Sequence, residues 1–176
     1  MSKNILVLSG SPRKGANTDR LVDAFLKGAE GKNVTLFRVA DLTIGGCRGC
    51  GYCFTHDHTC VQQDDMPQIL DALKNADAIA LASPVYYFGL TGQLKTAIDR
   101  FYALLGSIPV KRAALLLTCG NPDVKVADAT IAHFRAMSAF LGWEDAGHVV
   151  IPGLHAPDEI NGSALLADAE RLGREI

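Results

Sequence analysis

Short apolar runs alternate with amphipathic stretches along the whole chain, and this alternation restricts the folds that the chain can adopt. The runs expected to form buried strands are residues 5–8, 34–39, 76–82, 113–118 and 148–151. Helical periodicity follows them over about 17–30, 64–73, 91–105, 127–141 and 163–174. Strands that alternate with helices in this way form a mostly parallel sheet covered by helices on both faces. The sequence therefore predicts an α/β fold.

Composition narrows the class of protein further. A chain of 176 residues, 48% of them hydrophobic, is expected to fold as a single domain over residues 1–176. The formal net charge of −2 argues against general nucleic-acid binding, and no apolar run is long enough to cross a bilayer. The short apolar N-terminal stretch is no convincing signal peptide, so we expect a cytoplasmic protein. In that compartment clustered cysteines are more often metal-binding or redox-active than disulfide-bonded.

The segment Gly10-Ser-Pro-Arg-Lys-Gly-Ala-Asn-Thr18 follows the first expected strand and has the composition of a phosphate-binding loop. Its glycines allow a tight turn that exposes backbone N–H groups, Arg13 can pair with a phosphate, and the next helix directs its positive end at an anion. Neither G-x-G-x-x-G nor the Walker lysine motif is present, which favours a mononucleotide phosphate over NAD or ATP. The alternative is a polar strand-to-helix turn with an ordinary cap.

Five strands with a phosphate loop after the first favour a flavodoxin-like three-layer fold with the parallel sheet order 2-1-3-4-5. In this order ligands bind beyond the carboxyl ends of the strands, at the switch between strands one and three. The loops expected there are residues 9–18, 83–89 and 118–123, and we expect the cysteine-rich loop after strand two at the same edge. The sequence thus predicts one composite site.

The segment Ser83-Pro-Val-Tyr-Tyr-Phe-Gly89 puts a rigid proline and aromatic rings just past a buried strand. A flat isoalloxazine ring needs apolar walls of this kind together with backbone N–H groups at its polar edges. Thr118, Cys119 and Gly120 are expected on the opposite side of the pocket, with Cys119 as a small buried side chain. The alternative is that the aromatic residues cap the core or form an oligomer interface.

Four cysteines, Cys47, Cys50, Cys53 and Cys60, follow the spacing C-x2-C-x2-C-x6-C in one short loop. Closely spaced thiols can converge on one metal centre, and iron–sulfur clusters are held by such thiolate sets. His56 and His58 could instead join cysteines around zinc. A thiol pair that cycles through a disulfide is a third interpretation. The residues alone leave these alternatives open.

Three motifs in this order, Gly10–Thr18, the Cys47–Cys60 loop running into Asp64-Asp65-Met66, and Ser83–Gly89, resemble the NADPH-dependent FMN reductase superfamily. Within it the iron–sulfur flavoproteins are the most similar, over roughly residues 3–151. The resemblance implies noncovalent FMN and a homodimer or homotetramer with FMN near subunit contacts. Its motif positions put Ser9, Ser11, Arg13, Asn17 and Thr18 at the FMN phosphate, Pro84, Val85, Tyr86, Tyr87, Phe88 and Gly89 at the isoalloxazine, and Cys47, Cys50, Cys53 and Cys60 on a [4Fe-4S] cluster.

The implied activity is that of an NAD(P)H-dependent FMN reductase or quinone reductase. Electrons would pass from NAD(P)H or a reduced carrier through FMN to a quinone, a flavin or a redox protein, with or without a [4Fe-4S] cluster. Because the flavin performs the chemistry, we expect no catalytic side chain. The alternatives are an FMN electron carrier without enzymatic activity, and a thiol or zinc redox sensor.

Two expectations concern charged residues outside these motifs. Asp64 and Asp65 are expected to cap the helix that follows them. Lys95, Asp99 and Arg100 are expected on one charged, solvent-facing side of a helix.

Overall fold

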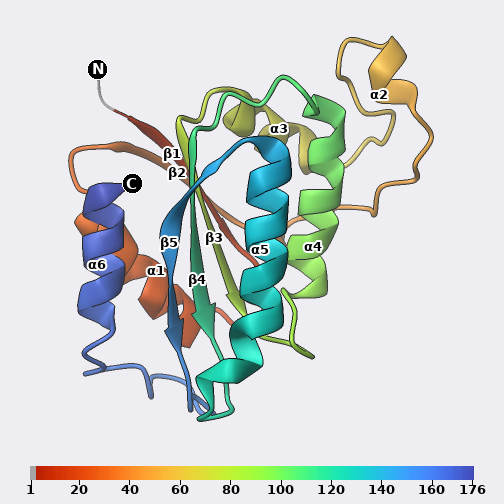
Figure 1. The fold of residues 1–176 in the computed structure, drawn as a ribbon. Coiled ribbons are helices and arrows are strands. Elements are labelled where there is room, and N and C mark those ends of the chain that lie inside the picture. Colours follow the sequence, from red (N-terminus) through yellow and green to blue (C-terminus); the bar gives the residue numbers. More distant parts are fainter. Residues whose placement is uncertain (1–2) are drawn as a thin grey trace.

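A five-stranded parallel sheet lies between two layers of helices in the computed structural model, which describes residues 3–176 (Figure 1). The strands are β1 (Asn4–Ser9), β2 (Asn33–Arg38), β3 (Ala78–Pro84), β4 (Arg112–Thr118) and β5 (Glu144–Ile151). Their order across the sheet is β2-β1-β3-β4-β5, and every neighbouring pair is parallel. The predicted flavodoxin-like order 2-1-3-4-5 is confirmed.

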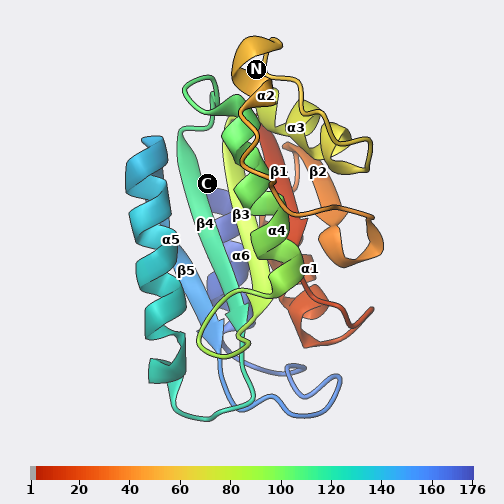
Figure 2. The same cartoon turned by 90° about the vertical axis from the view of Figure 1, so that its right-hand side faces the viewer.

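The helices divide between the two faces of the sheet. They are α1 (Asn17–Gly28), α2 (Tyr52–Thr55), α3 (Met66–Lys74), α4 (Gly92–Asp99), α5 (Asp128–Leu141) and α6 (Leu166–Glu175), with 3₁₀ turns η1 (Val39–Asp41), η2 (Arg100–Leu104) and η3 (Val124–Ala127). Helices α1 and α6 cover one face, and α3, α4 and α5 cover the other (Figures 1 and 2). Within residues 3–176, no helix combines the length and apolar character that crossing a membrane requires.

The alternation of side chains along β3 explains the two cores. Ile79 and Leu81 point into the core beneath α3, α4 and α5, whereas Ala78, Ala80 and Ala82 belong to the core beneath α1 and α6. Successive residues of a strand point to opposite faces, so a strand buried on both faces is apolar throughout. This is why the unbroken apolar runs of the sequence mark the strands.

Helices α1 and α6 approach each other closely through two glycines. A Cβ atom on Gly28 would lie 1.8 Å from the Glu170 carbonyl oxygen, and one on Gly173 would lie 2.1 Å from the Phe25 carbonyl oxygen. No side chain fits at either position, so only glycine permits this backbone contact.

Several element boundaries differ from the sequence prediction. Asn17 and Thr18 do not cap α1, since the N-cap is Ala16 and no side chain caps it. The helix expected to reach Leu105 ends at Asp99 and continues as η2, β5 begins already at Glu144, and α2 is an additional short helix inside the cysteine loop. Thr91 does cap α4, because its hydroxyl accepts a hydrogen bond from the Leu94 N–H.

The prediction that the cysteine loop lies at the same edge as the phosphate loop is wrong. After η1 the chain runs back past α4, and α2 lies at the end of the molecule opposite to the strand tips (Figures 1 and 2). His58 Nδ1 is 2.7 Å from the Ala103 carbonyl oxygen, which belongs to η2 and precedes the amino end of β4. The position of a loop after a strand depends on where the chain goes next, which local pattern does not reveal.

Candidate functional site

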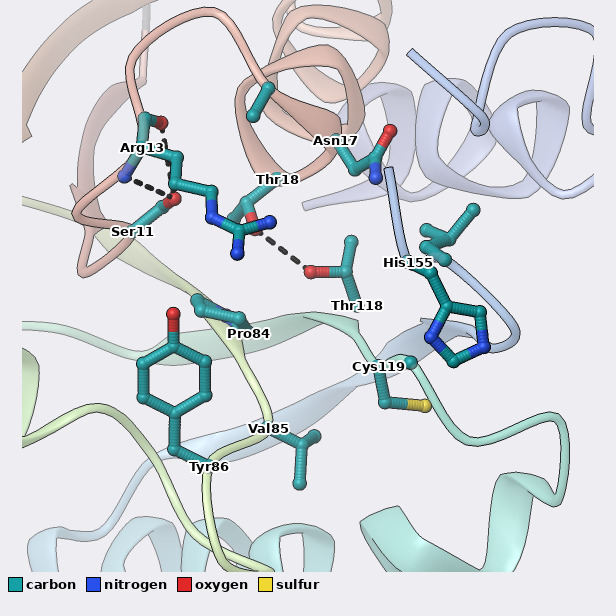
Figure 3. A pocket seen from close by; sticks show the side chains of 13 residues that line it. Ser11, Arg13, Asn17, Thr18, Pro84, Val85, Tyr86, Thr118, Cys119 and His155 are labelled. Atoms are coloured by element: carbon teal, nitrogen blue, oxygen red, sulfur yellow. Dashed lines mark hydrogen bonds between the residues drawn. The ribbon is translucent and has the colours of Figure 1, made fainter. Parts of the chain in front are cut away.

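A pocket of about 190 Å³ opens at the carboxyl ends of β1, β3 and β4 (Figure 3). It lies where the strand order reverses between β1 and β3, the position at which open α/β sheets bind ligands. Its lining residues are Ser11, Arg13, Ala16, Asn17, Thr18, Pro84, Val85, Tyr86, Thr118, Cys119, Gly120, Leu154 and His155.

Most residues proposed from the sequence to contact FMN thus lie around this pocket. The exceptions are Ser9, Tyr87, Phe88 and Gly89. Ser9 is buried beneath the loop, and its hydroxyl has no hydrogen-bond partner among the described residues. Tyr87, Phe88 and Gly89 do not line the pocket, and the Tyr87 side chain is fully exposed. Tyr87 and Phe88 therefore stand at the rim of the pocket, exposed to solvent.

The first turn of α1 faces the pocket without a side-chain cap. The uncapped first turn of a helix presents backbone N–H groups and the positive end of the helix dipole, which together favour an anion. Arg13 adds a positive charge from the preceding loop, and its side chain reaches over the pocket in Figure 3. The Ser11 hydroxyl shapes this loop by accepting the Arg13 N–H at 3.3 Å.

The carboxylate of Asp19 stands in the same turn, where it would repel an anion if it were unpaired. It is engaged on both sides: Arg38 donates to Oδ1, and the Gly15 N–H donates to Oδ2 at 2.6 Å. Arg38 also donates to the Ser11 carbonyl oxygen at 3.2 Å. The paired carboxylate therefore holds the loop in shape while Arg13 remains the charged group that lines the pocket.

The floor of the pocket joins α1 to β4. The Thr18 and Thr118 hydroxyl oxygens are 2.8 Å apart and buried (Figure 3). Next to them Cys119 is buried, as predicted, and burial raises the pKa of its thiol. A thiol with a raised pKa stays protonated at neutral pH, so Cys119 acts here as a small apolar wall rather than as a nucleophile.

The aromatic segment after β3 forms a tight turn. Tyr86 and Gly89 exchange both backbone hydrogen bonds at 3.0 Å, and Tyr87 and Phe88 between them have φ angles of 48° and 63°. Positive φ at bulky residues is unfavourable and persists only where the surroundings enforce it. The Thr130 hydroxyl of α5 supplies one such constraint by donating to the Phe88 carbonyl oxygen at 2.8 Å.

Sequence reasoning missed the segment after β5. Leu154 and His155 line the pocket, and the His155 ring packs against Gly120. The Asn17 amide fastens this segment to α1, because it donates to the Ala156 carbonyl oxygen at 2.8 Å and accepts the Ile160 N–H at 3.2 Å. The Asn17 side chain therefore makes its hydrogen bonds to the segment after β5, which lies over the pocket. The predicted sheet order was the available signal, since it puts the end of strand five at the same edge.

The cysteine loop forms a separate candidate site. Cys47, Cys50, Cys53 and Cys60 are all free and line one small pocket with residues of η2. Within residues 3–176 no three His, Cys, Asp or Glu side chains already converge as a metal site. The four thiols of one loop nevertheless line a common pocket, and thiolate sets of this kind are the ligands that iron–sulfur clusters use.

Arg100 closes this second site from beneath, and its predicted exposure to solvent is wrong. The side chain is 1% exposed and forms an ion pair with Asp64, with Nη1 2.7 Å from Oδ2. Burial would raise the pKa of Asp64, but hydrogen bonds from Arg100, Gly45 and Met66 outweigh this effect and hold the pKa below its ordinary value. Asp65 is the N-cap residue of α3, but no side-chain hydrogen bond caps the helix, so the predicted capping role of the two aspartate side chains is wrong. The Met66 N–H donates at 3.1 Å to Oδ1 of Asp64, which lies one residue before the N-cap.

Known proteins resemble the chain both in sequence and in fold. The NADPH-dependent FMN reductase family matches residues 3–146. An iron–sulfur flavoprotein of Archaeoglobus fulgidus is 44% identical over 93 residues, which cover 52% of this chain and 42% of that protein. The chain thus matches about half the length, or less, of such relatives.

Two further proteins match over nearly their whole length, one in sequence and one in fold. A Bacillus subtilis protein, whose name describes an NAD(P)H-dependent FMN-containing oxidoreductase, is 28% identical and is covered to 95%, with 96% of this chain. The structure of an NAD(P)H:quinone oxidoreductase from Methanothermobacter marburgensis superposes with a TM-score of 0.77 at 17% identity, covering 99% of this chain and 96% of that one. That likeness shows the fold. The sheet order, the pocket at the strand switch and the matched region together assign the chain to the NADPH-dependent FMN reductase family.

Proposed function

We propose that the protein is an FMN-dependent oxidoreductase that takes electrons from NAD(P)H and passes them to a quinone, a flavin or a redox protein. One observation carries the proposal: the uncapped first turn of α1 and the side chain of Arg13 face a pocket at the strand switch. A phosphate at this position would receive backbone N–H groups and a guanidinium at once. The names of the relatives support FMN and nicotinamide as the cofactor and the electron donor.

The residues around the pocket suggest a division of roles. Ser11, Arg13 and Thr18 would bind the phosphate, while Pro84, Val85 and Tyr86 would form one apolar wall for the isoalloxazine and Thr118, Cys119 and Gly120 the other. Bound FMN would supply the redox chemistry by accepting a hydride and releasing electrons to the acceptor. The protein positions the flavin, and the site needs no side-chain nucleophile.

We also propose that Cys47, Cys50, Cys53 and Cys60 hold a [4Fe-4S] cluster. The support is the common pocket that these thiols line and the names of the iron–sulfur flavoprotein relatives. The cysteine loop lies at one end of α4, and the strand tips at which the FMN pocket opens lie at the other end (Figure 2). Direct electron transfer between the cluster and a flavin would therefore favour a flavin that is bound by a neighbouring subunit.

A homodimer or homotetramer fits this arrangement. The pocket of about 190 Å³ is smaller than the roughly 300–1,000 Å³ of typical ligand sites, so bound FMN would project beyond it. Tyr87 and Phe88 stand exposed at its rim, where a second subunit could cover both the ring and the flavin. A cytoplasmic location remains a prediction.

The phosphate assignment is tested by comparing FMN with riboflavin. Arg13→Ala should weaken FMN binding about tenfold and leave riboflavin binding nearly unchanged, because only FMN carries the phosphate. Lys14→Ala is the matched control, since Lys14 is exposed and pairs with Asp41 at 3.1 Å. Equal losses for both ligands, or no flavin binding by the unaltered protein, would contradict the proposal.

A second experiment separates the oxidoreductase from the alternatives. Under anaerobic conditions NADH or NADPH should bleach the flavin absorbance rapidly, whereas a carrier without enzymatic activity would bleach slowly. Iron and sulfide analysis of anaerobically purified protein should find about four irons per chain for the proposed cluster. Zinc without iron, or free thiols without flavin, would favour a redox sensor.

A further inference from the structure

We propose that Arg100 is a positioning residue of the cysteine loop, and that its permanent charge raises the reduction potential of the cluster that the loop is proposed to hold. This inference rests on the proposed cluster and adds the residue that tunes it. The observation behind it is a buried guanidinium in direct contact with one of the four thiols.

The contacts of Arg100 tie both ends of the loop to η2. Nη1 donates to the Gly45 carbonyl oxygen at 2.8 Å, just before the first cysteine. Nη2 donates to Cys60 Sγ at 3.2 Å, the last cysteine. Asp64 accepts from both nitrogens, at 2.7 and 3.2 Å. One planar side chain therefore sets the distance across which the loop must close, and a lysine ammonium cannot reproduce this fork.

Asp64 divides its hydrogen bonds between the guanidinium of Arg100 and two backbone N–H groups. Asp64 also accepts the Gly45 N–H at 2.9 Å and the Met66 N–H at 3.1 Å, so backbone groups share the stabilisation of its charge. Arg100 Nε has no acceptor among the described residues, although the residue lines the same pocket as the cysteines. Buried, unpaired donors are rare in folded proteins, and an anionic occupant of this pocket would suit one.

The electrostatic consequence has a definite sign. Hydrogen bonds to the sulfurs and the net charge around a cluster set its reduction potential. Reduction adds negative charge, so a fixed cation that donates an N–H···S bond stabilises the reduced form more than the oxidised form. A guanidinium does not lose its proton in proteins, so this effect persists across the pH range. Asp64 acts in the opposite direction, because its negative charge disfavours the added electron.

The test compares four variants of the full chain, purified and reconstituted with iron and sulfide under anaerobic conditions. Arg100→Gln should lower the ratio of reduced to oxidised cluster at a fixed potential about tenfold, which equals about 59 mV for a one-electron couple. Asp64→Asn should shift the ratio the other way. Lys95→Gln is the control, since Lys95 lies on the preceding turn, is 45% exposed and pairs with Asp99. Shifts of opposite sign cannot come from general loosening of the fold.

Loop position is measured separately in the iron-free protein. The Gly45 amide, which donates to Asp64, should exchange with deuterium faster in Arg100→Gln than in the unaltered chain. Arg100→Lys should restore much of the potential but little of the amide protection, because it keeps the charge and loses the fork.

The outcomes separate this inference from the proposed function. If the unaltered chain takes up no iron, the cluster proposal and the effect on potential both fall, while amide exchange still decides the positioning role. If iron binds and Arg100→Gln matches the unaltered chain in potential and in Gly45 exchange, the inference about Arg100 is overturned and the cluster stands.

Discussion

The hydroxyl oxygens of Thr18 and Thr118 lie 2.8 Å apart in the interior and join the first turn of α1 to the carboxyl end of β4. Both residues line the pocket proposed to hold FMN. This hydrogen bond therefore couples the phosphate side of the site to one flavin wall. Each buried hydroxyl has the other as its hydrogen-bond partner.

Thr18→Val should lower the free energy of unfolding by about 1–3 kcal/mol, because it leaves a buried hydroxyl on Thr118 without its partner. Thr118→Val should cost a similar amount. The double variant should cost clearly less than the sum, since it removes both polar groups at nearly constant shape. Urea unfolding of the four proteins measures the coupling, and additive losses would refute it.

At the glycine contact between α1 and α6, we expect no residue larger than glycine to be tolerated. Gly173→Ala should destabilise the protein by about 1–3 kcal/mol, because the added methyl would meet backbone atoms that cannot move aside. Gly92→Ala is the matched control on α4, where an added Cβ meets nothing within 4 Å. It should be neutral or stabilise by up to about 1 kcal/mol. Equal thermal stability of the two variants would disprove the close contact.

The turn after β3 stores conformational strain. Tyr87→Gly should raise the unfolding free energy of dilute, flavin-free protein by about 0.5–1 kcal/mol, since glycine adopts a positive φ without the penalty of a larger residue. The exposed side chain of Tyr87 gives up little packing in return. Tyr86→Gly serves as the comparison and should destabilise, because Tyr86 has no positive φ for glycine to relieve and glycine adds freedom to the unfolded chain. A loss of stability in Tyr87→Gly at low protein concentration would contradict this account.

His133 on α5 predicts a pH dependence of stability. Burial lowers the pKa of His133, and the nearby charge of Lys95 lowers it further, while Asp99 acts in the opposite direction. The unfolded chain therefore binds a proton more readily, so the contribution of His133 is present above its ordinary pKa of 6.5 and is lost as the pH falls through the folded value.

His133→Gln should accordingly flatten the decline in stability between about pH 7 and pH 5. Lys95→Gln should move the folded pKa of His133 toward its ordinary value and reduce the decline in part. Thermal unfolding across this range provides the measurement. An unchanged slope in His133→Gln would show that other groups cause it.

Two residues show how much of the site the local sequence pattern could predict. Cys119 follows an unbroken apolar run, so its burial beside the pocket could be predicted and is confirmed. Arg100 shares a helical stretch with the exposed residues Lys95 and Asp99, and nothing local indicates that it turns inward. Its burial depends on Asp64, which lies 36 positions earlier and supplies the compensating charge. Partners that far apart leave no periodic signal.

The sequence by itself determined the strands, their order and the two loops at the strand switch, because apolar periodicity and turn composition are local properties and chain connectivity limits parallel sheets to few arrangements. Only the tertiary structure decided that the cysteine loop lies at the opposite end of α4, that Asn17 fastens the segment after β5 over the pocket, and that His155 lines the pocket. Each of these depends on the path of the chain through space. A polar group is buried only where a partner from a distant part of the sequence forms a hydrogen bond or ion pair with it. The packing of the whole chain determines which of these groups come together.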